Sequence, residues 1–493
     1  FPLKCLNSLY TEEGLLQVDD LVRMYTHSCS WFIGPFYHLV RLFHPDYVKP
    51  LLMAPASITV KDELIYGHLR PWLGQSLLLL NGEEWSHRRR LLTPAFHFDI
   101  LKNYIAKFNS ATNTMHVRHR ALVTACGCWI CSVFQDKWCD LAAKGTTNIE
   151  MFDHVTLMTL DSLLKCAFSY NSNCQRSTSE YVSAIVELSE LIIDRRQKIL
   201  HHWDCIYWRT QQGKRFRKAL SIVQRFTRKV VQKRRALISH QKTETDFTKA
   251  PQRKKDFVDI ILLSKDEEGR GLTDEEIHAE ANTFMFAGHD TTGSAICWTL
   301  YNLARHEPFQ EQCREEARDL MQGRDGHELE WSENTHSLHH LESLRLHAPV
   351  QAVTRKYTKD MTLPGERTVP KGVISLVSIY GTHHNPAVWT DPHEFQPLRF
   401  DPANTEGRAS HAFIPFSSGP RNCIGQKFAL AQLRVVVALT LLRFRLTPGV
   451  NPELGTSSGG VRRLPQLVLR AEGGLWVQLE PLTLHSLEEL QEE

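Results

Sequence analysis

The segment from Thr273 to Arg305 limits the possible folds most, because it carries a helical pattern of unusual length. Thr273 and Glu276 form a Ser/Thr-x-x-Glu capping box, and apolar residues recur at helical spacing from Ile277 onward. At about 1.5 Å per residue, such a helix is on the order of 45 Å long and crosses a whole domain. The pattern therefore predicts a mainly α-helical protein built around one central helix.

The middle of this predicted helix is unusual, because residues 287–293 read Ala-Gly-His-Asp-Thr-Thr-Gly. Most of these residues are poor helix formers, and their hydroxyl and carboxylate groups compete for backbone hydrogen bonds. A loose surface turn is the alternative, but apolar residues flank the segment on both sides. We therefore predict a buried, functional kink or local widening here.

Composition excludes several classes of protein. With 42% hydrophobic and 23% charged residues among 493, the chain has the composition of an ordinary globular protein of one or two lobes. A net charge of +3 gives no basis for nucleic-acid binding. We find no apolar run of the roughly 18 to 20 residues that would span a bilayer. The sequence also lacks an Asn-x-Ser/Thr sequon, which fits a cytosol-facing location.

Three other segments carry local signals. The polar stretch 240–255 predicts a loop, and the glycines after Arg443 predict strands joined by turns. The stretch 214–235 is basic with apolar residues at helical spacing. It predicts an amphipathic helix that lies on a membrane, meets an acidic partner, or packs its apolar stripe on the core. Three clustered cysteines within 126–131 lack a second pair at zinc spacing, so we interpret them as ordinary thiols.

Cys423 lies in a glycine-containing loop directly before an apolar-periodic helix. Nearby backbone N–H groups and the positive end of the helix dipole both favour thiolate over thiol. A thiolate is the axial ligand that pushes electron density onto haem iron. Gly419 permits a positive φ, Gly425 lets the backbone approach a flat macrocycle, and Arg421 offers a permanent cation for a propionate.

The pattern Phe416-x-x-Gly419-x-Arg421-x-Cys423-x-Gly425 resembles the haem-binding loop of the cytochromes P450. A structural cysteine before a helix is the alternative interpretation. The resemblance implies the P450 fold, mainly α with a smaller β region, in which haem lies between the long central helix and the Cys-loop helix. It also implies one catalytic domain over residues 1–493, with an N-terminal membrane anchor absent from this chain.

Further motifs follow the family's order. Glu342 and Arg345 stand three residues apart on one helix, and Arg399 resembles the third partner of the family's Glu-Arg-Arg cluster, which stabilises the fold. Trp85-x-x-x-Arg89 is similar to the family's propionate-binding helix. Arg355 is a further candidate for a propionate.

The 287–292 segment is similar to the family's oxygen-activation motif. By that resemblance, Thr291 holds a water or dioxygen by a hydrogen bond, and Asp290 helps to relay protons.

Within the family, the runs 91–98 and 157–163 are most similar to the mammalian omega-hydroxylases of fatty acids and eicosanoids. This resemblance implies hydroxylation of a lipid chain at the omega end, with O2 and with electrons from NADPH through a reductase. A small cytochrome is a further possible partner. It also implies contact with a membrane surface, on the cytosolic face of the endoplasmic reticulum.

Departures from the family pattern leave an alternative open. Ala287 replaces a Glu that can form an ester to the cofactor, so haem b is expected to be non-covalent. Residues 124–147 resemble an insertion, as do 449–461, whereas 331–341 is short and could misplace Glu342. The alternative is therefore a haem-binding relative with impaired catalysis. An acyl-chain carrier without chemistry would leave Cys423 unexplained.

Overall fold

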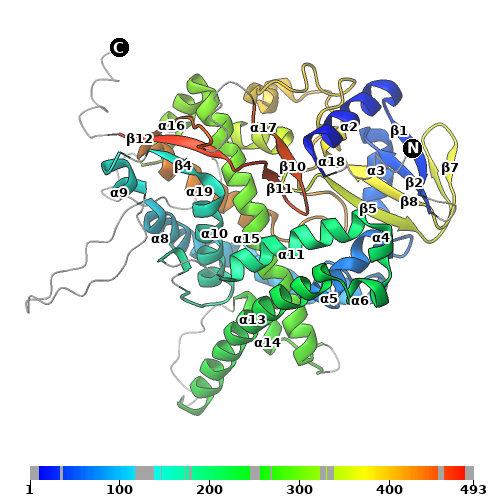
Figure 1. Ribbon diagram of the computed structural model, residues 1–493, viewed down its shortest axis with the longest axis horizontal. Coiled ribbons are helices and arrows are strands. Elements are labelled where there is room, and N and C mark those ends of the chain that lie inside the picture. The colour runs from blue at the N-terminus through cyan, green and yellow to red at the C-terminus, as the bar shows by residue number, and fades with distance from the viewer. Residues whose placement is uncertain are drawn as a thin grey trace, which may run out of the picture.

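The computed structural model describes residues 10–33, 37–116, 138–145, 147–172, 174–176, 180–244, 256–266, 269–321, 329, 338–452 and 460–482. Helices dominate, and strands form a smaller part, as predicted (Figure 1). The helices are α2 Glu12–Tyr25, α3 Pro45–Met53, α4 Glu63–Tyr66, α5 Arg70–Leu73, α6 Gly82–Leu92, α7 Phe98–Leu101, α8 Ile105–His116, α9 Trp138–Ala143, α10 Met151–Ala167, α11 Glu180–Gln197, α12 Asp204–Tyr207, α13 Gln211–Glu244, α14 Phe257–Leu263, α15 Asp274–Arg305, α16 Glu307–Met321, α17 Leu338–Leu346, α18 Ile379–His383 and α19 Gln426–Leu441.

In the described part of the chain, the strands fall into one larger and three smaller sheets. Their bounds are β1 Ser28–Ile33, β2 Tyr37–Leu42, β3 Thr59–Val60, β4 Asn148–Glu150, β5 Ala352–Tyr357, β6 Met361–Leu363, β7 Arg367–Val369, β8 Ile374–Ser378, β9 Phe444–Pro448, β10 Arg463–Pro465, β11 Leu469–Ala471 and β12 Trp476–Pro481. The larger sheet has the order β1-β2-β8-β5-β3, and β4-β12-β9 form a second sheet. The predicted strands after Arg443 are confirmed as β9 to β12.

Helix α15 is the predicted central helix and crosses the molecule (Figure 1). Its capping box is confirmed, because the Thr273 side chain accepts from the Glu276 N–H and the Glu276 carboxylate accepts from the Thr273 N–H. One half of α15 packs in an apolar cluster with Ile277 and Met285, and the other half packs in a second cluster with Trp298. The polar 287–293 segment lies between these two clusters.

The prediction of a widened segment at 287–293 is wrong, because α15 is α-helical throughout. The Thr291 hydroxyl donates to the Ala287 carbonyl at 2.7 Å, so its hydrogen-bonding need is met without disrupting the helix backbone. Gly288 has a packing role instead, since a Cβ there would lie 2.9 Å from the Leu163 side chain on α10. The glycine allows α10 and α15 to approach closely.

Helix α13 contains the basic amphipathic segment. Phe216, Val223 and Val230 are fully buried, whereas basic residues such as Lys214 and Arg217 are exposed. The apolar stripe therefore packs on the core, which was one of the three open interpretations. The helix continues to Glu244, so the loop predicted from residue 240 begins too early; residues 240–244 contain no Gly or Pro to end the helix.

Several predictions fall partly outside the described residues. Of the 124–147 insertion, only 138–145 and 147 are described, and 138–143 form α9. The clustered cysteines within 126–131 and the segments 245–255, 330–337 and 453–459 lie outside the described residues. Among the helices that the structure describes, none is long and apolar enough to cross a membrane.

Candidate functional site

A cavity of about 1110 Å³ lies between α15 and the loop that precedes α19. Its wall includes Ala287, Gly288 and Thr291 from α15 and Cys423 from the loop. The rest of the lining is largely aliphatic and aromatic, with side chains such as those of Leu69, Phe96, Phe284, Leu376 and Val468. The structure therefore brings the two strongest sequence signals, residues 287–292 and the Cys423 loop, onto one cavity.

The Cys423 loop is held by backbone hydrogen bonds. The Cys423 N–H donates to the Phe416 carbonyl at 3.0 Å, and Gly425 is the N-cap of α19. The Cys423 side chain is exposed to the cavity, but its enclosure by the protein raises the pKa of the thiol, whereas a hydrogen bond from the Gly425 N–H and the charge of Arg89 lower that pKa to a lesser extent. The Gly425 N–H thus favours the thiolate, as predicted for a local donor, although the pKa of the thiol is raised overall. A bound metal cation would restore the thiolate.

The two glycines of the loop have different roles. Gly419 has φ +72°, and a Cβ there would lie only 2.0 Å from the Leu52 carbonyl oxygen. The predicted need for a positive φ is confirmed, and a close approach to α3 adds to it. At Gly425 a Cβ would meet only the Cys423 Sγ, at 3.9 Å. Gly425 thus leaves the cavity open beside the sulfur, as a flat group would require.

Three cations gather in the cavity wall beside this loop. Lys61, Arg355 and Arg421 all line the cavity. Burial lowers the pKa of Lys61 well below its usual range, and the charges of Arg355 and Arg421 lower it further. Burial followed by the charge of Arg355 lowers the pKa of Arg421 to about 10. Among the described residues, the Arg421 Nε has no hydrogen-bond partner. This excess of buried positive charge fits an anionic group such as a haem propionate.

The sequence predicted Arg355 and Arg421 but missed Lys61. Lys61 donates to the Tyr66 hydroxyl at 2.8 Å. The charge of the Asp62 carboxylate partly offsets the lowering of the Lys61 pKa. No local pattern identified Lys61, because its place near Arg355 follows only from the pairing of β3 with β5.

Trp85 and Arg89 on α6 also line the cavity. The Arg421 guanidinium lies over the Trp85 ring, 4.4 Å from its centroid. Arg89 donates to the carbonyl oxygen and the Oδ1 of Asn422, at 2.9 and 2.8 Å. The structure therefore gives Arg89 a contact that was not predicted, since it holds the Cys423 loop.

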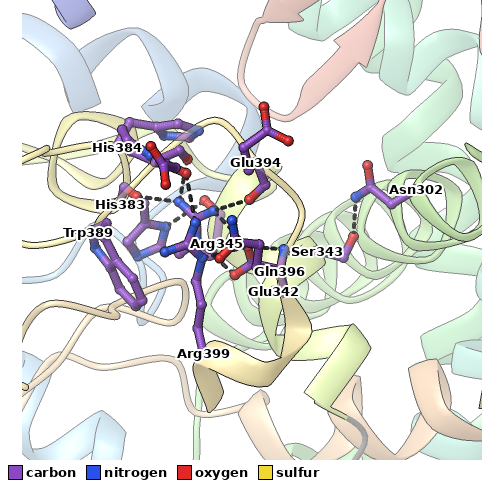
Figure 2. Close-up of polar contacts among 12 residues, drawn as sticks. Asn302, Glu342, Ser343, Arg345, His383, His384, Trp389, Glu394, Gln396 and Arg399 are labelled. Carbon is purple, nitrogen blue, oxygen red and sulfur yellow. Dashed lines mark hydrogen bonds and ion pairs between the residues drawn. The ribbon is translucent and has the colours of Figure 1, made fainter. Parts of the chain in front are cut away.

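The predicted Glu-Arg-Arg cluster is brought together (Figure 2). The Arg345 guanidinium donates to both carboxylate oxygens of Glu342 at 2.7 Å, and the Arg399 Nε lies 3.4 Å from the same carboxylate. The Gln396 N–H also donates to Glu342, at 2.9 Å. Glu342 and Arg345 are fully buried and are absent from the cavity lining, which agrees with a structural role. The short 331–341 lead-in does not displace Glu342, so the impaired-relative alternative loses this argument.

Asp290 and Thr291 face different surroundings. Thr291 lines the cavity. Asp290 is buried, and its carboxylate forms an ion pair with Arg470 on β11 rather than lining the cavity. Arg470 was missed by the sequence, because its partner lies 180 positions away in the chain.

The chain is similar in sequence to known proteins over nearly its whole length. The family model described as "Cytochrome P450" matches residues 5–469. Cytochrome P450 4F3 of Mus musculus is 49% identical over 478 residues, which is 96% of this chain and 86% of the relative. Cytochrome P450 4F3 of Homo sapiens is 50% identical, covering 96% of this chain and 87% of the relative. The ultra-long-chain fatty acid omega-hydroxylase of Homo sapiens is 50% identical, covering 96% and 85%.

Proposed function

Because this chain belongs to the cytochrome P450 family, and so is a haem monooxygenase, we propose that it hydroxylates fatty acids or eicosanoids at or near the omega carbon. The observation that carries this proposal is the largely apolar cavity of about 1110 Å³ that Cys423 and Thr291 share. Such a wall suits a long alkyl chain. A relative at 50% identity is named for omega-hydroxylation of ultra-long-chain fatty acids, which supports the same substrate class.

The residues around the cavity fit haem. Cys423 would supply the axial thiolate, and Arg355, Arg421 and Lys61 would pair with the propionates. When bound, haem iron supplies the activation of O2 and the insertion of one oxygen atom into a substrate C–H bond. Ala287 lines the cavity and offers no carboxylate for an ester, which supports a haem that would be held without an ester bond to the protein.

The protons for this reaction would pass along α15. The Thr291 hydroxyl donates to the Ala287 carbonyl, lines the cavity, and could donate into it after a rotation about χ1. Asp290, the preceding residue, would help to relay protons to Thr291. Its carboxylate forms an ion pair with Arg470 on β11, so the relay would require this contact to open.

The electrons would come from NADPH through a flavoprotein reductase, with a small cytochrome as a further possible donor. The lipid substrate would reach the enzyme at a membrane surface, on the cytosolic face of the endoplasmic reticulum. Exposed Ile199, Leu200 and Trp203 lie near the cavity, and Ile199 and Trp203 line it, so an apolar surface meets the substrate chamber.

The carbon monoxide difference spectrum of the reduced, haem-loaded protein tests the ligand assignment. We expect a strongly red-shifted Soret band that Cys423→Ala abolishes and that Cys205→Ala, at an exposed cysteine elsewhere, preserves. Retention of the band in Cys423→Ala would refute the ligand. Product analysis with reductase, NADPH and either hexadecanoic acid or an eicosanoid then tests the substrate class. An intact spectrum without hydroxylated product would refute that class.

A further inference from the structure

Arg41 is a buried arginine in the cavity wall that has no carboxylate partner among the described residues. It lies on β2, is 6% exposed and lines the cavity. Within the part of the chain that the structure describes, its Nε has no hydrogen-bond partner. The Arg41 guanidinium carbon lies over the Trp31 ring, 5.3 Å from its centroid.

The electrostatic surroundings of Arg41 do not balance its charge. Burial lowers the pKa of Arg41, and the titratable group that acts on it is the Cys29 thiol on the neighbouring strand β1. Burial raises the pKa of Cys29 in turn, so this thiol stays neutral. A buried charge without a partner is unfavourable, which indicates that a partner arrives from outside the fold.

In the sheet, strand β8 lies between β2, which carries Arg41, and β5, which carries Arg355 (Figure 1). Arg41 pairs with Leu376 on β8, and Leu376 pairs with Thr354 on β5, which directly precedes Arg355. Paired residues on adjacent strands point to the same face, and all three line the cavity. Because strands are about 4.8 Å apart, Arg41 lies about 10 Å across the sheet from Thr354.

We propose that Arg41 binds the carboxylate of the lipid substrate, which deepens the proposed function and rests on it. An arginine offers a planar pair of N–H donors that matches a carboxylate. Holding the carboxylate at β2 leaves the alkyl chain to extend across the apolar cavity with its methyl end directed to the Cys423 loop. Arg41 is thus a specificity residue that favours oxidation near the chain end.

Arg196 is the main competitor for this role. Its Nε also lacks a hydrogen-bond partner among the described residues, and it lines the cavity, but it is half-buried and its guanidinium already donates to the Ile65 carbonyl. Lys61, Arg355 and Arg421 stand beside the Cys423 loop, where a bound carboxylate would direct the methyl end away from the sulfur. Arg41 is therefore the cation whose position and burial agree best with a carboxylate anchor.

The experiment compares hexadecanoic acid, its methyl ester and hexadecan-1-ol as ligands of the haem-loaded protein, followed by the change in haem absorbance. Wild type is expected to bind the acid at least about tenfold more tightly than the ester. Arg41→Gln should weaken binding of the acid by about tenfold to hundredfold and change the other two by less than about threefold. Arg41→Lys should keep the preference for the acid, and Arg196→Gln should leave it unchanged.

Equal affinity of wild type for the acid and the ester would overturn the proposal that Arg41 binds the carboxylate, even if Arg41→Gln failed to retain haem. An equal loss for all three ligands in Arg41→Gln would assign Arg41 a packing role, and an acid-selective loss in Arg196→Gln would move the site. In those cases the proposed function stands. Failure of wild type to bind any of the three, with an intact carbon monoxide spectrum, would overturn the proposed function as well.

Discussion

Arg89 donates two hydrogen bonds to Asn422, the residue that directly precedes Cys423. The contact joins α6 to the loop that carries the proposed iron ligand. The charge of Arg89 also opposes the effect of burial on the pKa of the Cys423 thiol. One side chain therefore fixes both the position of the sulfur and part of its electrostatic environment.

Replacement of Arg89 by alanine is expected to reduce haem retention. The variant loses two hydrogen bonds from a charged donor and the favourable charge near Cys423, together about 2 to 3 kcal/mol. The haem-to-protein ratio and the height of the red-shifted carbon monoxide band would measure the loss. Arg90→Ala, at an exposed position on the same helix, is the control. Equal haem content in the two variants would contradict this role.

Gly419→Ala should destabilise the Cys423 loop strongly. The new Cβ would need a left-handed backbone and would lie 2.0 Å from the Leu52 carbonyl. We expect a loss of about 3 kcal/mol or more in the free energy of unfolding. Gly407→Ala isolates the backbone effect, because Gly407 has φ +78° with nothing within 4 Å, and it should lose about 1 to 2 kcal/mol. A smaller effect at Gly419 than at Gly407 in chemical denaturation would argue against the close contact.

Glu342→Ala should destabilise the protein by about 3 to 5 kcal/mol, because Arg345 would remain fully buried without its carboxylate. Chemical denaturation of the haem-free chain would measure this effect apart from the cofactor. Glu187→Ala removes a partly exposed ion pair with Arg215 and should change the stability by less than about 1 kcal/mol. If both substitutions had the same small effect, the cluster would not be a structural centre.

Thr291→Ala should separate oxygen consumption from substrate oxidation. Loss of the hydroxyl removes the proposed proton donor on the cavity wall, whereas haem binding should stay intact. We expect a several-fold rise in hydrogen peroxide released per NADPH consumed. Thr291→Ser keeps the hydroxyl and should retain most of the coupling. Unchanged coupling in Thr291→Ala would remove this residue from the reaction.

Glu280 predicts a pH-dependent contribution to stability. Burial raises the pKa of Glu280 to about 7 from its ordinary value of 4.5, despite the ion pair with Arg88. Because the folded state then binds a proton that the unfolded state has lost, the contribution is fully present below pH 4.5 and is lost as the pH rises to about 7.

Glu280→Gln tests this contribution directly. The amide cannot ionise, so the stability of the variant should fall less than that of wild type between pH 4.5 and 7. The expected difference is about 3 kcal/mol over this range, measured by denaturation at several pH values. Parallel pH profiles for the two proteins would show that Glu280 titrates normally. Glu150, whose pKa burial raises to about 7, titrates in the same window and remains in both proteins.

The parts predicted well from the sequence depend on residues close together in the chain. The capping box of α15, the positive φ of Gly419 and the pairing of Glu342 with Arg345 all follow from spacings of a few residues. Such local rules apply wherever the segment lies in the fold.

The parts that were missed depend on tertiary contacts. The ion pairs of Asp290 with Arg470 and of Glu280 with Arg88 join distant segments, so no local pattern announces them. The pKa of the Cys423 thiol also depends on tertiary structure. The Gly425 donor is local, but the enclosure that raises this pKa and the charge of Arg89 that lowers it arise only when the chain folds.

The close packing of α10 against α15 has a consequence for substrate range. Leu163 lies against Gly288, and the Thr159 hydroxyl donates to the His289 carbonyl at 3.0 Å, so α10 fixes the rotation of the helix that carries Thr291. Leu163 also lines the cavity. A substitution at Leu163 that admits bulkier lipids would therefore also make the orientation of the Thr291 hydroxyl less fixed. The range of lipids that this enzyme accepts and the fraction of NADPH that it converts into product therefore depend on the same pair of helices.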